Sequence, residues 1–201
     1  MISTTKQKKL SFGGTALATP FPTRGGVSIV GSLAGGFLAA GSEELAQVHA
    51  QMLLEGTAAH NKKDVQILLD SWGAALSFAA SAQRLRFFAR VPATHADALL
   101  SLIAEILREP AFPRGELAIL KGREEASIAM EAQDTREQAR IALSRLVYSK
   151  GHPGWSESTQ ESKKILAGIT QKSLQQFHKR AHGGQSLIVS FAGDLNPHKA
   201  F

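Results

Sequence analysis

The sequence contains no cysteine, which excludes disulfide bonds and metal sites built on thiolates. No apolar run approaches the roughly 20 residues that a helix needs to cross a bilayer, so no membrane span is predicted. The phosphate-binding patterns G-x-x-x-x-G-K-[ST] and G-x-G-x-x-G are missing, as is the G-x-S-x-G turn that carries a catalytic serine. These absences leave nucleotide binding and hydrolysis by a serine or cysteine nucleophile without support.

The composition is that of a globular domain, because 43% of the 201 residues are hydrophobic and 20% are charged. The net charge of +6 comes partly from short lysine groups at 6–9, 62–63 and 163–164. No basic stripe is interleaved with aromatic residues, so these groups indicate solvated faces and a terminal arm rather than a nucleic-acid partner. The most apolar early stretch, 25–40, is broken by glycines and lies too far from the start to be a signal peptide.

Apolar periodicity predicts strands and helices that do not alternate one for one. This pattern favours an α+β fold class, a two-layer sandwich with one mostly antiparallel sheet and helices on one face. The run 27–34 is apolar or small on both faces, which predicts a strand buried on both sides. The absence of repeats and low-complexity linkers predicts a single domain over 1–201. The predicted strands cover about 10–19, 27–34, 75–80, 84–91 and 187–192, and the predicted helices about 43–56, 61–73, 94–108, 115–133 and 135–148, with short helices centred on 165 and 177.

Residues 45–57 are the most informative segment of the sequence. They form an amphipathic pattern that runs through Met52-Leu53 to Gly56-Thr57. This sequence resembles the signature helix of the inverzincin zinc peptidases, in which H-x-x-E-H precedes a Met-Leu-x-x-Gly-Thr run. The two ligand positions hold Gln47 and Gln51, and the general-base position holds Ala50. Carboxamides are poor zinc ligands and a methyl group cannot accept a proton from water, so the segment predicts a scaffold without its chemistry.

The whole chain resembles one homologous unit of the pitrilysin (insulinase-like) zinc metallopeptidase family. Each matching segment is weak alone, but six occur in the family's order across nearly the whole chain. The wording of 133–136 and 151–155 is most similar to the noncatalytic partner unit of a bacterial member, and the end shortly after 196–197 predicts a fragment of a longer multi-domain chain. The six segments are Met52 to Thr57, Leu69-x-x-Trp72-Gly73-Ala74, Arg108 to Phe112, the glutamate-bearing long helix, Tyr148-x-x-Gly151-His152-Pro153, and Ala192-Gly193-Asp194.

The resemblance also implies where a third zinc ligand would lie, because the family places a glutamate on the long helix. The usual interval from Gln51 ends near 127–128, where there is no carboxylate. Glu124 and Glu131 flank that point, each about one helical turn away, and Glu131 is the favoured relic. A lone carboxylate does not hold zinc, so the chain is expected to bind no metal and no cofactor.

The function implied by the resemblance is that of a noncatalytic domain. It would pair with a catalytic zinc unit, in the same chain or in a separate subunit, and enclose peptide substrates. The family resemblance places it in the periplasm or cytoplasm of a bacterium, with no signal in this chain to decide.

Two alternatives remain open at this stage. One is an active zinc metallopeptidase with an atypical site built from His49, His60 and Glu131; the other is an assembly subunit without peptide contact. His49 lies two residues from each lost ligand position, so on a helix it points to another face and is interpreted as a packing or surface residue. His152 is interpreted as a loop residue, and Trp72 and Trp155 as packing residues.

Overall fold

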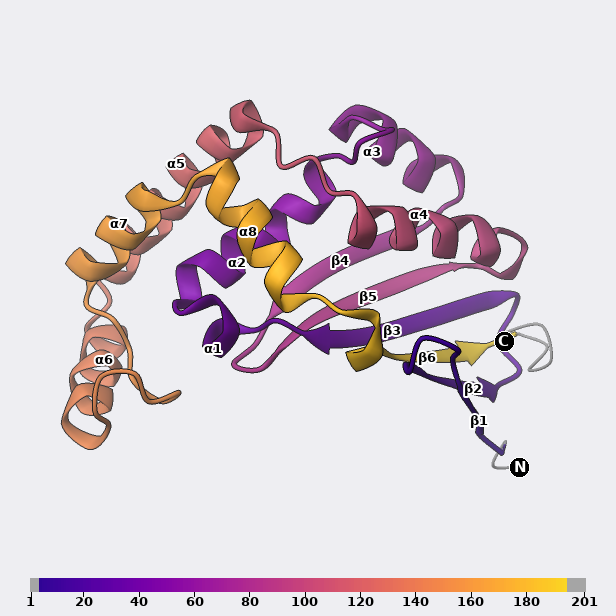
Figure 1. The fold of residues 1–201 in the computed structure, drawn as a ribbon, viewed down its shortest axis with the longest axis horizontal. Helices are drawn as coiled ribbons and strands as arrows, with labels where there is room; N and C mark the ends of the chain where they lie inside the picture. Colours follow the sequence, from indigo (N-terminus) through magenta and orange to yellow (C-terminus); the bar gives the residue numbers. More distant parts are fainter. Residues whose placement is uncertain (1–3, 195–201) are drawn as a thin grey trace.

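The computed structural model describes residues 4–194 and shows one sheet with helices on one of its faces (Figure 1). The strands lie in the order β1-β2-β6-β3-β5-β4. Strands β2 and β6 are parallel and all other neighbours are antiparallel, which confirms the predicted mostly antiparallel sheet. The strands are β1 (Lys6–Lys9), β2 (Thr15–Pro20), β3 (Gly26–Ala34), β4 (Ala75–Ala80), β5 (Arg84–Pro92) and β6 (Ile188–Gly193).

The helical layer lies above the sheet in Figure 1, with α6 set apart at the end farthest from β1. Short 3₁₀ turns adjoin these elements. Leu53–Glu55 follows α2, Ala93–His95 precedes α4, and Gly184–Ser186 precedes β6. The helices are α1 (Phe37–Ala40), α2 (Glu43–Met52), α3 (Lys62–Ser71), α4 (Ala96–Arg108), α5 (Arg114–Glu131), α6 (Thr135–Val147), α7 (Thr159–Gly168) and α8 (Gln171–Ala181).

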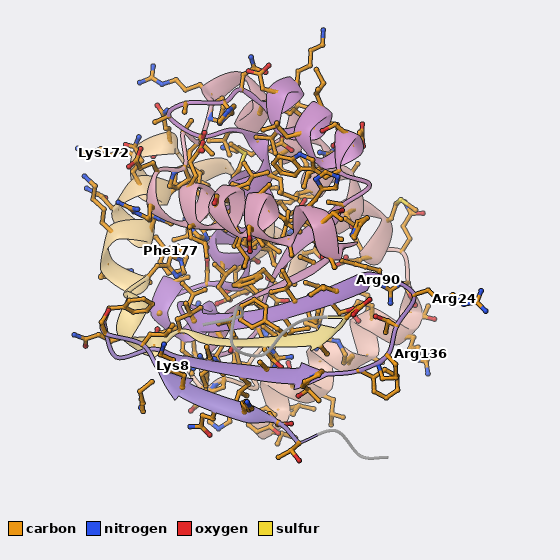
Figure 2. The ribbon with its side chains drawn as sticks, turned by 90° about the vertical axis from the view of Figure 1, so that its right-hand side faces the viewer. Lys8, Arg24, Arg90, Arg136, Lys172 and Phe177 are labelled. Carbon is orange, nitrogen blue, oxygen red and sulfur yellow. The ribbon has the colours of Figure 1, made fainter. Side chains whose placement is uncertain are left out.

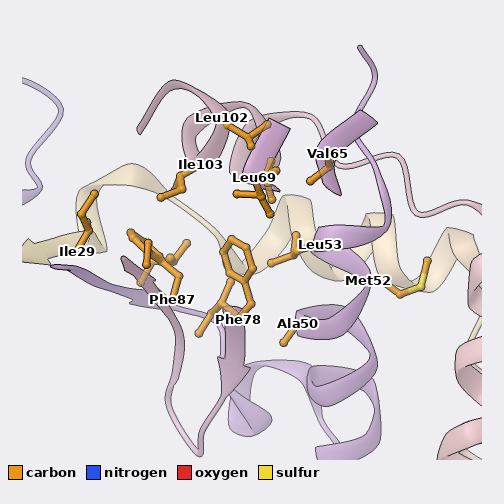
Figure 3. Packing of buried hydrophobic residues seen from close by; sticks show 14 of the residues in the cluster. Ile29, Ala50, Met52, Leu53, Val65, Leu69, Phe78, Phe87, Leu102 and Ile103 are labelled. Atoms are coloured by element: carbon orange, nitrogen blue, oxygen red, sulfur yellow. The ribbon is translucent and has the colours of Figure 1, made fainter. Parts of the chain in front are cut away.

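The core forms where the inward face of the sheet meets the apolar stripes of the helices. Alternate β5 residues point inward because successive strand residues face opposite sides of a sheet. Phe87 of β5 and Phe78 of β4 meet Leu69, Leu102 and other helix residues in this layer, as Figure 3 shows. The α4 stripe recurs at helical spacing and is fully buried at Leu99, Leu102, Ile103 and Ile106.

The other face of the sheet is open, which corrects the prediction for residues 27–34. Only alternate β3 residues are buried, and Val30 on the opposite side is 43% exposed. Its neighbour in register, Phe88 of β5, is 45% exposed. No helix covers this face in the described part of the chain, so the apolar and small residues there do not indicate burial.

The predicted strand over 10–19 is corrected at its start, because β2 begins only at Thr15, after a turn at the glycine pair 13–14, which favours a turn in the sequence. Leu10 N–H donates to the Gly14 carbonyl at 2.8 Å, and Gly13 N–H donates to the Leu10 carbonyl at 2.9 Å. Gly13 adopts a φ of 96°, which favours glycine. Strand β1 therefore precedes this turn and pairs with β2 as a hairpin.

Capping residues mark the start of α2, which carries the degenerate motif, and the start of α3. The Ser42 hydroxyl accepts from Leu45 N–H at 3.2 Å, and Glu43 lies in the first turn, where a carboxylate suits the helix dipole. Gly56 stops the helical segment at a φ of 130°. Asn61 caps α3 in a capping box with Asp64, as the sequence predicts.

Charged side chains cover the outside of this body. Figure 2 shows Arg24 and Lys172 extending away from the ribbon, and both are exposed. Phe177, labelled in the same view on α8, is only 1% exposed and packs inside. No helix in the described residues is long and apolar enough to cross a membrane.

Candidate functional site

A cleft of about 850 Å³ lies beside the helix that carries the degenerate motif. One wall is α2, which presents Gln47 and Gln51 at its surface. Residues four apart share a helix face, so the two lost ligand positions point into the same space. The facing walls come from α5, α6 and the loop 151–157.

The two amides on the α2 wall are bound to carboxylates. Gln51 Nε2–H donates to Glu124 Oε1 at 2.8 Å, which joins α2 to α5. Gln47 hydrogen-bonds the side chain of Glu43 one turn earlier. Ala50 is 1% exposed and packs in the core rather than in the cleft. The three motif positions Gln47, Ala50 and Gln51 therefore offer neither an imidazole nor a carboxylate.

Carboxylates dominate the rest of the cleft. Desolvation and the negative charge of neighbouring Glu44 raise the pKa of Glu43 above its usual value. The negative charge of Glu131 raises it further. Arg140 partly offsets it while its own Nε–H donates to Glu137 Oε2 at 2.9 Å. The cleft is thus acidic in a chain whose net charge is +6. Its acidic lining residues are Glu43, Glu44, Glu124, Glu131, Asp134, Glu137 and Glu157.

The two candidate relic carboxylates have different contacts. Glu124 accepts the hydrogen bond from Gln51, whereas Glu131 accepts from the Ser127 hydroxyl at 3.3 Å on its own helix. Both line the cleft. The contact with a motif position favours Glu124 over Glu131 as the counterpart of the third ligand, and that role stays a prediction for both.

The atypical zinc site predicted from His49, His60 and Glu131 is not formed, which corrects that alternative. His60 Nδ1 lies 2.9 Å from Glu105 Oε1, and the same carboxylate accepts from Thr57. His49 is completely buried on a different face of α2 from Gln47 and Gln51, as its spacing predicts. Glu131 lies in the cleft on the other side of the helix.

His49 instead belongs to a buried group of three histidines with His178 and His182. Their ligand-type nitrogens lie within 4.8 Å of one another, and within residues 4–194 this is the only group of metal-ligating side chains so arranged. His49 Nε2 lies 3.0 Å from His178 Nδ1. Burial lowers the pKa of His49 well below its usual value, with the other two rings adding to the effect. Burial also lowers the pKa of His178, and that of His182 to about 4.

Neither His178 nor His182 stands out in the sequence. The available signal was their spacing of four residues, which places both on one side of the end of α8. Nothing local connects them with His49, which lies 129 residues before His178.

The remaining predicted residues have structural contacts. His152 lies in the loop after α6, stacks on Tyr148 with ring centroids 4.5 Å apart, and accepts from Gly154 N–H at 3.0 Å. Arg145 lies over the Trp155 ring at 4.6 Å. Trp72 packs against the hydrophobic core. These contacts agree with the packing and loop interpretations.

No known family model and no curated protein matches the chain. Solved structures do match. The inactive domain of an M16 peptidase from Pseudomonas fluorescens is 22% identical, with a TM-score of 0.87 over 98% of this chain and 48% of that one. A protease from Helicobacter pylori is 16% identical, with a TM-score of 0.83 over 100% of this chain and 48% of the other. Pitrilysin is 18% identical, with a TM-score of 0.79 over 98% of this chain and 22% of its own.

These likenesses show that the chain has the fold of a pitrilysin-like M16 unit, which is the fold that the sequence resemblance implied. The chain spans about half the length of the first two matched structures.

Proposed function

We propose that this chain is a noncatalytic pitrilysin-type unit that pairs with a catalytic zinc unit and forms one wall of a chamber for peptide substrates. The observation that carries the proposal is the 2.8 Å contact between Gln51 and Glu124. In an active unit these positions would supply zinc ligands, but here an amide and a carboxylate satisfy each other. Hydrolysis would then depend on the partner, whose metal-bound water attacks the peptide.

The length of the matched structures supports the pairing. The inactive domain from Pseudomonas fluorescens is about twice as long as the matched segment, and one copy of this fold accounts for about half of it. We propose that a second unit of similar size accompanies this chain, and the catalytic unit would lie in the same chain or in a separate subunit. The catalytic histidines and glutamate would belong to that unit.

The first test is an activity measurement on the chain alone and with a catalytic unit that carries H-x-x-E-H. We expect no cleavage of an unfolded protein by the chain alone, and zinc-dependent cleavage when the two form a complex. The control is Gln51→Ala, which should leave the activity of the complex unchanged because position 51 holds no zinc. Zinc-dependent cleavage by the purified chain alone would refute the proposal.

The second test asks whether the cleft contacts peptide. A photo-crosslinking residue in place of Gln47 should capture a peptide substrate in the assembled complex, because Gln47 lines the cleft. The same residue in place of exposed Ile67 on α3 is the matched control and should capture none. Equal or absent capture at both positions in an active complex would favour the assembly subunit without peptide contact.

A further inference from the structure

We propose that His49, His178 and His182 form a zinc-type metal site inside the fold, on the opposite side of α2 from the degenerate motif. The three rings come from α2 and from the end of α8, and two of them are anchored to the ends of other elements. The site would hold a structural ion and is independent of the proposed pairing function.

Two of the rings already have the arrangement typical of metal-bound histidine. A ligating histidine almost always donates its other ring N–H to a carbonyl or carboxylate, which fixes its tautomer. His178 Nε2 lies 3.1 Å from the Leu107 carbonyl, and His182 Nδ1 lies 2.8 Å from the Ala34 carbonyl. A carbonyl can only accept, so both nitrogens carry hydrogen. His178 Nδ1 and His182 Nε2 therefore present lone pairs.

His49 completes the set through a change of tautomer. Its Nε2 now donates to His178 Nδ1 across 3.0 Å. Two nitrogens bound to one tetrahedral zinc lie roughly 3.3 Å apart, given bonds of about 2.0–2.1 Å. The ion would replace the bridging hydrogen, and that proton would move to His49 Nδ1. All three imidazoles would stay neutral, so binding would release no proton from them.

Two buried lone pairs in this group lack a partner. His49 Nδ1 and His182 Nε2 are both inaccessible to solvent and without a hydrogen bond. A buried polar atom left without a hydrogen bond destabilises the fold, so its presence in a packed core calls for an explanation. An ion would take up the His182 lone pair directly. The displaced proton would move to His49 Nδ1, which has no hydrogen-bond partner in either state, so the ion accounts for the His182 atom only.

The surroundings suit a structural ion. Phe112 and Phe177 flank His49, with ring centroids 5.4 and 4.9 Å away, so this side of the group is apolar, and the fourth position of a tetrahedral ion would be filled by water at the less buried His182 edge. A side chain at Gly35 would place its Cβ 2.1 Å from His182 Cε1, so glycine is needed for the ring to sit there. Three imidazoles without a carboxylate select zinc, nickel or copper over magnesium or calcium.

The site would join four elements of the fold. His49 lies on α2, and His178 and His182 lie at the end of α8. Their carbonyl partners lie at the end of α4 and at the end of β3. An ion held here would fix the helical layer to the sheet.

The test is metal titration of the full chain after chelator treatment and buffer exchange. Calorimetry with Zn²⁺ should show one ion per chain, and Co²⁺ should give the visible absorption of a tetrahedral nitrogen site. His182→Gln lies at the less buried edge of the group and should weaken binding by more than about tenfold. His152→Gln is the matched control in a surface loop and should bind as the wild type does.

A failure of this proposal is distinct from a failure of the proposed function. No stoichiometric Zn²⁺ or Co²⁺ binding by the folded wild-type chain would overturn the metal site. Binding that survives in His182→Gln, or that is lost in Gln51→Ala, would overturn it as well. Neither the Zn²⁺ titration nor the Co²⁺ titration measures peptidase activity, so their results do not test the pairing proposal.

Discussion

The two sides of α2 differ in the chemistry that they offer. The cleft side carries Gln47 and Gln51, where imidazoles would be needed to bind zinc, and both amides are bound to carboxylates. The core side carries His49, which meets two further imidazoles. Positions only two residues apart therefore carry different potential metal ligands, with amides on the cleft side and an imidazole on the core side. The cleft side meets a carboxylate of α5, whereas the core side meets imidazoles of α8.

Acidification should have the largest effect on this comparison, and it acts on the core side. Burial holds the pKa of His182 at about 4, against 6.5 for an exposed ring. The unfolded chain takes up protons below about pH 6.5 and the folded chain does not until about pH 4, so stability falls as the pH drops through this window. His182 alone should lower the free energy of unfolding by roughly 3 kcal/mol as the pH falls from about 6.5 to 4, and His49 and His178 should add to this loss.

Urea denaturation with a chelator present, at several pH values between 7 and 4, measures this loss. Carboxylates also titrate in the lower part of the window, so the comparison is with His182→Gln. The wild type should lose more stability than this variant. Parallel curves for the two proteins would contradict the prediction.

Truncation of each side separately should have the next largest effect. His49→Ala opens a cavity and leaves His178 Nδ1 unsatisfied, which should lower the free energy of unfolding by about 3 kcal/mol. Gln47→Ala removes a half-buried amide on the cleft side and should cost less than about 0.5 kcal/mol. Denaturation midpoints of both variants at pH 7 give the two values. Equal losses in the free energy of unfolding would mean that the two sides of α2 contribute equally to the stability of the fold.

The smallest expected effect concerns the contact between Gln51 and Glu124. A double-mutant cycle with Gln51→Ala and Glu124→Ala should give a coupling of about 1 kcal/mol, because the bond is half-buried and charge-assisted. The matched pair is Gln66 and Asp70 on α3, which bond at 2.9 Å in solvent. Its coupling should be about 0.3 kcal/mol. A cleft pair no stronger than this surface pair would weaken the case that the amide and the carboxylate satisfy each other.

Much of the fold could be predicted because its signals are local. The α4 stripe recurs at helical spacing, and Asn61 and Gly73 mark the ends of the α3 segment within a few residues of it. Strand β1 was not predicted, and the reason for this is also local. Strand β1 consists of Lys6–Lys9, which has no apolar alternation, and it forms by pairing with β2 rather than by burying a face. The exposed side of β3 could not be inferred because it depends on which face the helices cover.

The candidate site could be predicted only in part. The spacing of Gln47 and Gln51 puts both on one helix face, as observed. Glu124 and Glu131 are seven residues apart on one helix and therefore share a face, so only the packing of α5 against α2 shows which one meets Gln51. The meeting of His49 with His178 and His182 is a long-range contact between separate helices. No pattern within either segment predicts it.

The position of β6 in the sheet bears on how the chain folds as it leaves the ribosome. The hairpin of β1 and β2 reaches the rest of the sheet only through β6, which lies between β2 and β3. Residues 4–20 are synthesised before the other described residues. Their hairpin can pair with the rest of the sheet only after residues 188–193 have been synthesised. Until then the hairpin has an unpaired edge, and a nascent chain arrested before Ile188 should be open to proteases there.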